Sequence, residues 1–316
     1  MYCIVIPFSQ SFDDIWFTYK IPFELENCLK VWMIVNIPFS NKNILWLVSS
    51  TFAETSLDKN KIKSVLSLYN SDIFLNKYQI LLLNWISNNY FCLAHASLGL
   101  FFPTNLKSKL QKNKFSFSLK LPDFSYNYNN PKILNNSQQE VFDEIKIWNK
   151  KKYFLYWVTW SWKTEIYINL IKHYLDLWKQ SLLLVPEIIL TNQIFDRITK
   201  VFWNDVLVIN STVSEAKKTL YWDMIYQNKA KIIVWTRSSI FYPYNNLWLI
   251  IIDEEHDNSY ISDNTPRYDA IDVCEKICEF QNDLKLVLAS WTPKINHMYK
   301  WLKWDYKVLN LFWEYK

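Results

Sequence analysis

The apolar residues in the second half of the chain form short uninterrupted runs, and segments of helix length separate these runs. Helices are expected at 163–178 and 188–202, between runs that resemble strands. Apolar runs flanked by helices are typical of parallel strands that are buried on both faces of a sheet. The pattern therefore predicts a doubly wound α/β domain at 132–316. Its strand-like runs are YFLYW, SLLLVP, VLVIN, KIIVW, LWLIIID and KLVLAS.

The first 105 residues show a different pattern, in which short strand-like runs are broken by Pro, Asn and Ser. A helical stretch is expected around 72–90. These features predict a small β-rich domain with appended helices at 1–105. Residues 106–131 are rich in Lys and Asn and weakly patterned, so they are expected to form a linker or a reduced winged-helix module. The strand-like runs are MYCIVIPF, FTYKIPF, KVWMIVNIPF and NILWLVSS.

The composition is unusual in one respect, because the chain has almost no glycine. Its 316 residues include one glycine, Gly99, and 17 tryptophans, whereas glycine ordinarily makes up about 7% of a protein. An α/β domain needs residues that accept a left-handed backbone, and glycine does so most readily. Glycine and tryptophan together make up about 6% of this chain, close to an ordinary glycine share. The count suggests that most of the tryptophans occupy glycine positions.

The net charge and the cysteine content exclude few classes of function. The net charge of +5 is compatible with a nucleic-acid partner, but many proteins are equally basic. The five cysteines contain no C-x-x-C pair, which favours structural roles over a zinc site, and their odd number favours a reducing compartment. The N-terminus has no basic leader, and no segment approaches 18 uncharged apolar residues. The chain is therefore expected to be cytoplasmic, with no membrane partner.

The stretch WVTWSWKT, 157–164, lies where the first strand of the predicted sheet meets a helix. With glycine at its three tryptophan positions it matches the phosphate-binding pattern G-x-x-x-x-G-K-[ST], whose bare amides face the phosphates. Lys163 would then reach the β- and γ-phosphates, and Thr164 would bind Mg²⁺. Tryptophan would block the phosphates, and each left-handed residue would cost about 1–2 kcal/mol; an aromatic cluster at a helix start is the alternative. The loop's predicted ATP-binding residues are Trp157, Thr159, Trp160, Ser161, Trp162, Lys163 and Thr164.

A second candidate element is IIIDEEHD, 250–257, an apolar run that ends in acidic residues. Such a run fits a Walker B motif, in which Asp253 holds Mg²⁺ and Glu254 orients or deprotonates the attacking water. The alternative is an ordinary acidic turn after a strand. Because ligands of parallel sheets lie beyond the carboxyl ends of the strands, the phosphate loop upstream favours the catalytic interpretation.

Several motifs between 132 and 310 resemble, in order, the core of the primosomal protein N′ family. These proteins are DEAH-type superfamily 2 DNA helicases that restart stalled replication forks. The first hundred residues also resemble the 3′-DNA-binding domain of this family, through FTYKIP and IVNIPFS. The resemblance implies an α/β fold, with a RecA-like helicase lobe preceded by a small β-rich DNA-binding domain. The core motifs are WVTWSWKTE, LLLVPEIILT, IIVWTRSSIF, NLWLIIIDEEHDNSY and PRYDA.

The resemblance implies an ATP-dependent 3′-to-5′ DNA helicase and assigns a role to each motif. Gln138 would read adenine, and His256 with the Ser290–Thr292 pair would couple hydrolysis to movement. In the loop 257–268, Tyr260, Arg267 and Tyr268 would stack on exposed bases, although a solvated loop with two anchoring tyrosines is the alternative. The implied catalytic residues are Lys163, Thr164, Asp253, Glu254 and His256. The implied DNA-binding residues are Phe17, Tyr19, Glu187, Arg237, Tyr260, Arg267 and Tyr268.

The resemblance also implies cofactors and partners. ATP and Mg²⁺ are expected, with the metal held by Thr164 and Asp253. Forked or single-stranded DNA, the primosome and single-strand-binding proteins are the expected partners. The 316 residues contain neither the second helicase lobe, with its arginine finger, nor the cysteines that bind zinc in full-length members. Two other functions stay open: a fragment that binds DNA and ATP without unwinding, and a subunit of another superfamily 2 translocase.

Tryptophan stands at many positions where this family has glycine. Trp85 and Trp222 lie where tryptophan itself is plausible. We therefore hypothesise that UGA codons with the meaning glycine have been rendered as tryptophan. The glycine positions of the family are Trp46, Trp157, Trp160, Trp162, Trp178, Trp203, Trp235, Trp248 and Trp304.

Overall fold

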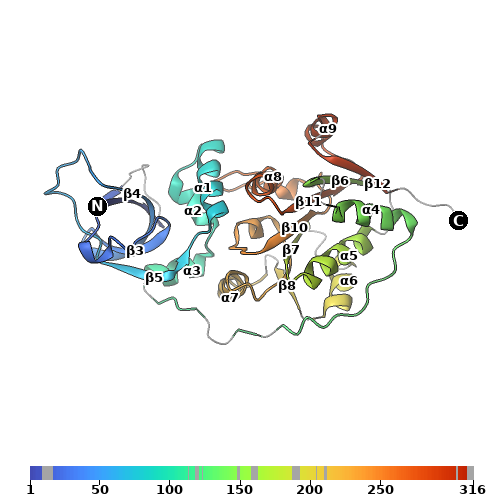
Figure 1. Ribbon diagram of the computed structural model, residues 1–316, viewed down its shortest axis with the longest axis horizontal. Coiled ribbons are helices and arrows are strands. Elements are labelled where there is room, and N and C mark those ends of the chain that lie inside the picture. The colour runs from blue at the N-terminus through green and yellow to red at the C-terminus, as the bar shows by residue number, and fades with distance from the viewer. Residues whose placement is uncertain are drawn as a thin grey trace. The chain divides into compact units, whose positions relative to one another are not determined.

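The computed structural model divides the chain into two units, Met1–Ser118 and Leu119–Lys316. Figure 1 shows the course of the chain through both units. The domain boundaries expected at 105 and 131 stay predictions. The structure describes residues 1–8, 17–112, 114–117, 121–122, 124–147, 150–157, 163–186, 193–203, 205–209, 212–303 and 305–311.

The described residues of the first unit build a five-stranded antiparallel sheet in the order β2-β1-β4-β3-β5, followed by helices. The helix expected at 72–90 begins only at Lys77, because the residues before it pair with β3. Asn76 and Gln79 form a capping box, which fixes this start. The elements are β1 Tyr2–Pro7, β2 Phe17–Lys20, η1 Phe23–Leu25, β3 Met33–Phe39, β4 Lys42–Phe52, β5 Ser67–Phe74, α1 Lys77–Asn89, α2 Ala94–Leu100 and α3 Thr104–Gln111.

The second unit contains a seven-stranded sheet in its described part, in the order β12-β6-β11-β10-β7-β9-β8, and every pairing in it is parallel. The predicted α/β fold class, with a parallel sheet preceded by a small β-rich domain, is confirmed. The strands are β6 Lys152–Trp157, β7 Gln180–Leu184, β8 Val206–Ile209, β9 Ile232–Trp235, β10 Leu247–Ile252, β11 Lys285–Ser290 and β12 Lys307–Leu311.

Helices cover both faces of this sheet, as its apolar strands require. Figure 1 shows α4, α5 and α6 on one face and α7 and α8 on the other. The first face holds a continuous core that includes Tyr167 and Ile171 of α5, Ile198 of α6 and Leu183 of β7. The helical elements are α4 Asn136–Lys146, α5 Lys163–Asp176, α6 Gln193–Phe202, α7 Glu215–Tyr226, η3 Arg237–Phe241, η4 Asn258–Tyr260, α8 Ala270–Phe280 and α9 Ile295–Leu302.

The strand order explains why distant motifs meet. β6, β11, β10 and β7 are consecutive neighbours, and all four run in the same direction. Their carboxyl ends therefore lie along one edge of the sheet, followed by α5 after β6 and by Asp253 after β10. This edge is the usual ligand-binding edge of a doubly wound sheet.

The second half of the expected linker belongs to the second unit and packs against other parts of it. The backbone N–H of Ser125 donates to Asp205 over 3.0 Å, and the hydroxyl of Tyr126 accepts the N–H of Lys231 over 2.9 Å. The N–H of Asn129 donates to the carbonyl of Val201 over 2.8 Å. Hydrogen bonds of polar residues therefore hold this segment in place. Because they need no apolar face, the segment shows no apolar periodicity in the sequence.

Two tryptophans end helices with a left-handed backbone. Trp178 has φ 58°, and the N–H groups of Trp178 and Lys179 close α5 on the carbonyls of Leu175 and Tyr174. Trp203 has φ 54°, and its N–H donates to the carbonyl of Thr199 at the end of α6. These are the Schellman and αL caps, whose left-handed residue is usually glycine. The local backbone therefore fits the glycine hypothesis at both positions.

In the part of the chain that the structure describes, no helix combines the length and the hydrophobicity that a membrane crossing requires.

Candidate functional site

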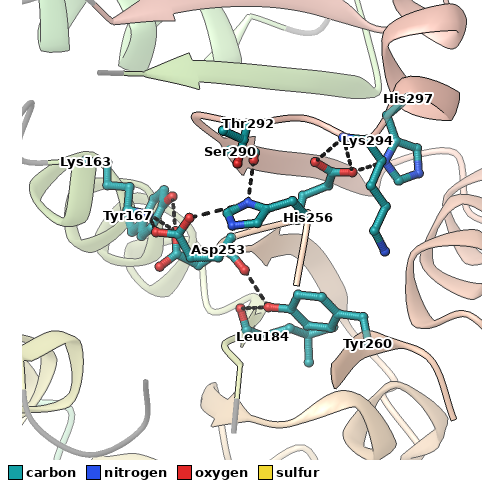
Figure 2. A network of polar contacts seen from close by, with 12 residues as sticks. Lys163, Tyr167, Leu184, Asp253, His256, Tyr260, Ser290, Thr292, Lys294 and His297 are labelled. Atoms are coloured by element: carbon teal, nitrogen blue, oxygen red, sulfur yellow. Dashed lines mark hydrogen bonds and ion pairs between the residues drawn. The ribbon is translucent and has the colours of Figure 1, made fainter. Parts of the chain in front are cut away.

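The candidate site is built around Lys163, the first residue of α5. Its ammonium lies 2.5 Å from Asp253 Oδ1 and 2.5 Å from Glu254 Oε1. Lys163 is buried and Asp253 is only 1% exposed, so the charges attract one another with little screening by water. Figure 2 shows Lys163 beside Asp253 at the strand end. The phosphate-loop lysine and the Walker B carboxylates therefore form one charged cluster.

Two oxygens of this cluster lack a hydrogen-bond partner. Asp253 Oδ2 and Glu254 Oε2 are both buried without one within the described residues, although Glu254 Oε2 lies 3.7 Å from His256 Nδ1. A buried polar atom without a partner costs about 1–3 kcal/mol, so it marks a place where a ligand or water fits. Mg²⁺ is usually bound through one or two carboxylates, with water and phosphate as the other ligands. Among the described residues, no group of three or more His, Cys, Asp or Glu is arranged to hold a metal ion by itself.

Glu254 is held in an unfavourable backbone and electrostatic state. Its φ of 49° places a residue with a side chain in the left-handed region, where the cost is about 1–2 kcal/mol. Burial, followed by the charge of Asp253, raises the pKa of the Glu254 carboxyl, although Lys163 opposes this shift. Strain and a raised pKa on one side chain are typical of a functional position.

Two buried tyrosines fix Asp253. The hydroxyl of Tyr167, on α5, donates to Asp253 Oδ1 over 2.9 Å. The hydroxyl of Tyr260, in η4, lies 2.5 Å from the carbonyl oxygen of Asp253 and 3.2 Å from that of Leu184. Burial and the nearby charge of Asp253 raise the pKa of both phenols well above the ordinary value, so both stay protonated donors. Side chain and main chain of Asp253 are thus held separately (Figure 2).

His256 connects the Walker B segment to the next strand. Its Nδ1 lies 2.8 Å from Ser290 Oγ at the end of β11, and 3.7 Å from a carboxylate oxygen of Glu254. Ser290 Oγ also accepts the N–H of Thr292 over 3.2 Å. The three residues that the sequence predicted as a coupling element are therefore in direct contact (Figure 2).

Glu255 makes a second connection, to helix α9. Its carboxylate is fully buried and receives a short contact from His297 Nδ1. Both of its oxygens also lie 3.4 Å from the N–H of Lys294, immediately before α9. An anion at this end is favoured by the unpaired N–H groups and by the helix dipole. The residue next to Glu254 therefore caps α9.

The other predicted nucleotide-binding residues are described in part. Trp157 ends β6, where its ring lies 3.8 Å from Lys163 Nζ and its buried indole N–H has no partner among the described residues. Thr164 is buried at the start of α5. Gln138 is buried on α4, and its Oε1 accepts the N–H of Asn135 in a capping box. Thr159, Trp160, Ser161, Trp162 and Glu187 lie outside the described residues.

The predicted DNA-binding residues of the second unit differ in exposure. Tyr260 and Tyr268 are only 1% and 3% exposed, so neither ring can stack on a base in this arrangement. The alternative of anchoring tyrosines describes them better, because tertiary packing decides the exposure of an aromatic loop residue. Arg267 is exposed, whereas Arg237 donates to the carbonyl of Ser259 over 2.9 Å and to that of Ile261. Arg237 thus holds the loop on both sides of Tyr260.

The predicted DNA-binding residues of the first unit lie on β2. Tyr19 is buried, and its hydroxyl donates to the carbonyl of Pro38 over 3.1 Å. Phe17 is partly buried between Phe39 and Trp46, with ring centroids 5.0 and 4.9 Å away. The indole of Trp46 therefore fills the space beside Phe17 that a smaller residue would leave open.

The sequence interpretation missed Tyr167, Glu255 and His297. A signal for Tyr167 was present, because it follows Lys163 by four residues and so lies one turn further on the same helix face. Glu255 could have been noticed as a third acid after a buried strand. His297 had no local signal, since its partner lies 42 residues away.

Comparisons with known proteins agree with this architecture. Residues 4–103 match the family model of the PriA 3'DNA-binding domain, and residues 135–299 match that of the DEAD/DEAH box helicase. The replication restart protein PriA of Rickettsia prowazekii is 31% identical over 99% of this chain and 46% of its own length. That of Bacillus subtilis is 37% identical over 57% of this chain and 23% of its own.

Among solved structures, RecG bound to a three-way DNA junction aligns with a TM-score of 0.44 and 20% identity, over 59% of this chain and 24% of that one. The chain spans less than half the length of the PriA relatives that it matches. The expected resemblance to the N-terminal part of replication-restart helicases is confirmed. Because the helicase match covers more than half of the residues, the chain belongs to the DEAD/DEAH box helicase family.

Proposed function

We propose that this chain is the N-terminal part of an ATP-dependent 3′-to-5′ DNA helicase that acts in replication restart. The second unit would bind ATP with Mg²⁺, and the first unit would hold DNA. The observation that supports this most directly is the contact of Lys163 with both Asp253 and Glu254 at the carboxyl edge of the sheet. Forked or single-stranded DNA, the primosome and single-strand-binding proteins are the partners that we propose for the longer protein.

The charged cluster suggests how the site would work. In this structure the ammonium of Lys163 pairs with the carboxylates of Asp253 and Glu254. A bound triphosphate would offer this ammonium phosphate oxygens with a higher negative charge. Once Lys163 turns to the phosphates, Asp253 and the Thr164 hydroxyl would hold Mg²⁺, which offsets the charge of the phosphates when bound. Glu254 would orient the attacking water, and its raised pKa suits it to accept a proton. His256 would report the state of Glu254 to Ser290 and Thr292, and Gln138 would read adenine.

We propose two kinds of DNA contact. Arg267 is exposed and suits a phosphate, and Arg237 would act by holding the loop 257–268, with Glu187 as a further contact. Phe17 and Tyr19 would bind DNA from the first unit. Since Tyr260 and Tyr268 are buried, they would contribute by anchoring the loop unless it opens.

We also infer that the nucleotide site requires glycine at 157, 160 and 162. The ring of Trp157 lies against Lys163 Nζ, on the side chain that phosphates must reach. The left-handed backbones of Trp178 and Trp203 support the same reading elsewhere in the unit. Mass spectrometry of peptides from the native protein tests the inference, because a peptide mass with an indole at residue 160 would contradict it.

Binding of a fluorescent ATP analogue tests the nucleotide site. The 316-residue chain with glycine at 157, 160 and 162 should bind it in the presence of Mg²⁺. Lys163→Ala should weaken binding by about tenfold or more, because a charge-assisted bond is worth about 1.5–3 kcal/mol. Lys172→Ala is the matched control, since Lys172 lies on the same helix and pairs with Asp176. Equal affinity of the Lys163 and Lys172 variants would refute the proposal.

The alternative function is a fragment that binds DNA and ATP without unwinding. It rests on the same contacts of Lys163 with Asp253 and Glu254, which account for nucleotide binding without any movement along DNA. Release of phosphate that increases on addition of single-stranded DNA would reject the alternative. Nucleotide binding without such release would favour it.

A further inference from the structure

Two donors to the Asp253 carboxylate, among the described residues, meet at one of its oxygens. Lys163 Nζ and the hydroxyl of Tyr167 contact Oδ1, at 2.5 and 2.9 Å. The other oxygen, Oδ2, is buried without a hydrogen-bond partner in the part of the chain that the structure describes. Lys163 and Tyr167 lie one turn apart on α5, so a single helix face supplies both donors.

The two donors differ in their freedom to move. Lys163 carries a long side chain and is shared between Asp253 and Glu254. The ring of Tyr167 is fully buried in the core between α5 and the sheet, so its hydroxyl has a fixed place. When Lys163 turns to a phosphate, as the proposed function requires, Tyr167 is the donor that stays.

A donor that stays is needed because Asp253 is almost completely buried. A buried carboxylate without a hydrogen-bond donor is free to change its rotamer, because nothing holds either oxygen in place. Such a change would spoil it as a partner for a cation. The hydroxyl of Tyr167 prevents it, because it donates to Oδ1 and leaves Oδ2 as the acceptor.

We infer that Tyr167 is a positioning residue for Asp253, which holds Oδ1 so that Oδ2 can serve the hydrated Mg²⁺ of a bound nucleotide. The inference rests on the proposed function of the second unit as a nucleotide-binding lobe. Tyr167 itself touches neither nucleotide nor metal in this scheme, and its hydroxyl acts through the carboxylate. Mutation of a residue that holds a metal ligand by a hydrogen bond typically lowers metal affinity by about 10–100-fold.

A neighbouring tyrosine supplies a matched control. Tyr174 lies on the same helix and is also buried, and burial raises the pKa of its phenol as well. Within the described residues its hydroxyl makes no contact with Asp253 or Glu254. Each substitution removes one buried phenol hydroxyl from α5. Only the substitution of Tyr167 also removes a hydrogen bond to Asp253.

The test is the Mg²⁺ dependence of nucleotide binding, measured with a fluorescent ATP analogue on the 316-residue chain with glycine at 157, 160 and 162. Tyr167→Phe should raise the Mg²⁺ midpoint by about tenfold or more and leave the affinity in EDTA unchanged. Tyr174→Phe should leave both unchanged. In the Asp253→Asn background, Tyr167→Phe should have no further effect on the midpoint.

The outcomes separate this inference from the function on which it rests. Nucleotide binding by the parent chain with an unchanged Mg²⁺ midpoint in Tyr167→Phe overturns the inference alone. A parent chain that binds no nucleotide overturns the proposed function and the inference with it. Thermal melts check that each variant is folded. If Tyr167→Phe is unfolded, Tyr167→Met replaces it, since it also lacks the hydroxyl and keeps the apolar volume, and the same shift is expected.

Discussion

The left-handed backbone at Trp203 leads to a prediction about which small residue the position prefers. We compare Trp203→Gly with Trp203→Ala, because both remove the indole and differ only in their tolerance of φ 54°. The left-handed region costs a residue with a Cβ about 1–2 kcal/mol. Glycine also lowers the stability of the fold by about 0.4–1 kcal/mol, because it gives the unfolded chain more conformational freedom. The glycine variant should therefore be more stable than the alanine variant by about 0.5–1 kcal/mol.

The side chain of Trp203 makes this comparison clean. It is 61% exposed, and the loss of its remaining contacts is common to both variants. Lys200 is the control, since it is exposed on the same helix and lies before the cap. At Lys200 the order should reverse, with alanine more stable than glycine by up to about 1 kcal/mol, because glycine is a poor helix former.

Urea denaturation, monitored by circular dichroism, gives the free energy of unfolding of all four variants under the same conditions. The sign of the difference between glycine and alanine at each position is the decisive quantity, since uncertainties in extrapolation cancel. Alanine at 203 as stable as glycine would refute the assignment of this position as a glycine cap. The same comparison at Trp178 should give the same sign as at Trp203, because its φ is 58°.

Four further predictions follow from the site. His297→Ala should destabilise the fold by about 1–3 kcal/mol, because it removes the side-chain donor to the buried Glu255 carboxylate, whereas Tyr299→Ala on the exposed face of the same helix should change the urea midpoint little. Tyr260→Phe should lose about 1–3 kcal/mol of stability and leave the affinity for single-stranded DNA unchanged, while Arg267→Ala should weaken DNA binding; unchanged DNA affinity of Arg267→Ala would contradict the phosphate role of this arginine. Burial raises the pKa of Glu254, so ionisation of this acid opposes folding above the folded-state pKa, and the penalty fades as the pH falls through that value. Glu254→Gln should therefore be more stable than the parent at pH 7 in a urea titration, with the difference shrinking toward the unfolded pKa of 4.5; a difference that grows in acid would contradict this. Native peptides that span residues 178 and 203 should carry glycine masses, and tryptophan masses there would remove the basis of the glycine hypothesis.

The sheet could be predicted from the sequence because its strands are buried on both faces. Runs such as KLVLAS and LWLIIID are uninterrupted, and β11 Lys285–Ser290 and β10 Leu247–Ile252 lie within them. The meeting of Lys163 with Asp253 was predictable too, since parallel strands present their carboxyl ends along one edge. Strand order was not predictable, because every strand has a similar apolar surface.

Features that depend on contacts between residues far apart in the chain could not be predicted from the sequence. Tyr260 was expected to stack on bases because its loop resembles a DNA-sensing loop of the family, yet its hydroxyl donates to the main-chain carbonyls of Leu184 and Asp253. Tyr126 and Asn129 lie in a segment that resembled a linker, and hydrogen bonds to distant residues hold it against the second unit. Such contacts follow from the completed fold and leave no periodic pattern along the chain.

The cap on α9 has a mechanical consequence. Glu254 and Glu255 are adjacent, and the carboxylate of Glu255 is bonded to Lys294 and His297. The end of β10 is therefore connected directly to the first turn of α9, whose side chains Ile295, Met298 and Tyr299 face the solvent. A displacement of Glu254 by a ligand would have a short route, through one neighbouring residue, to the outer surface of this unit.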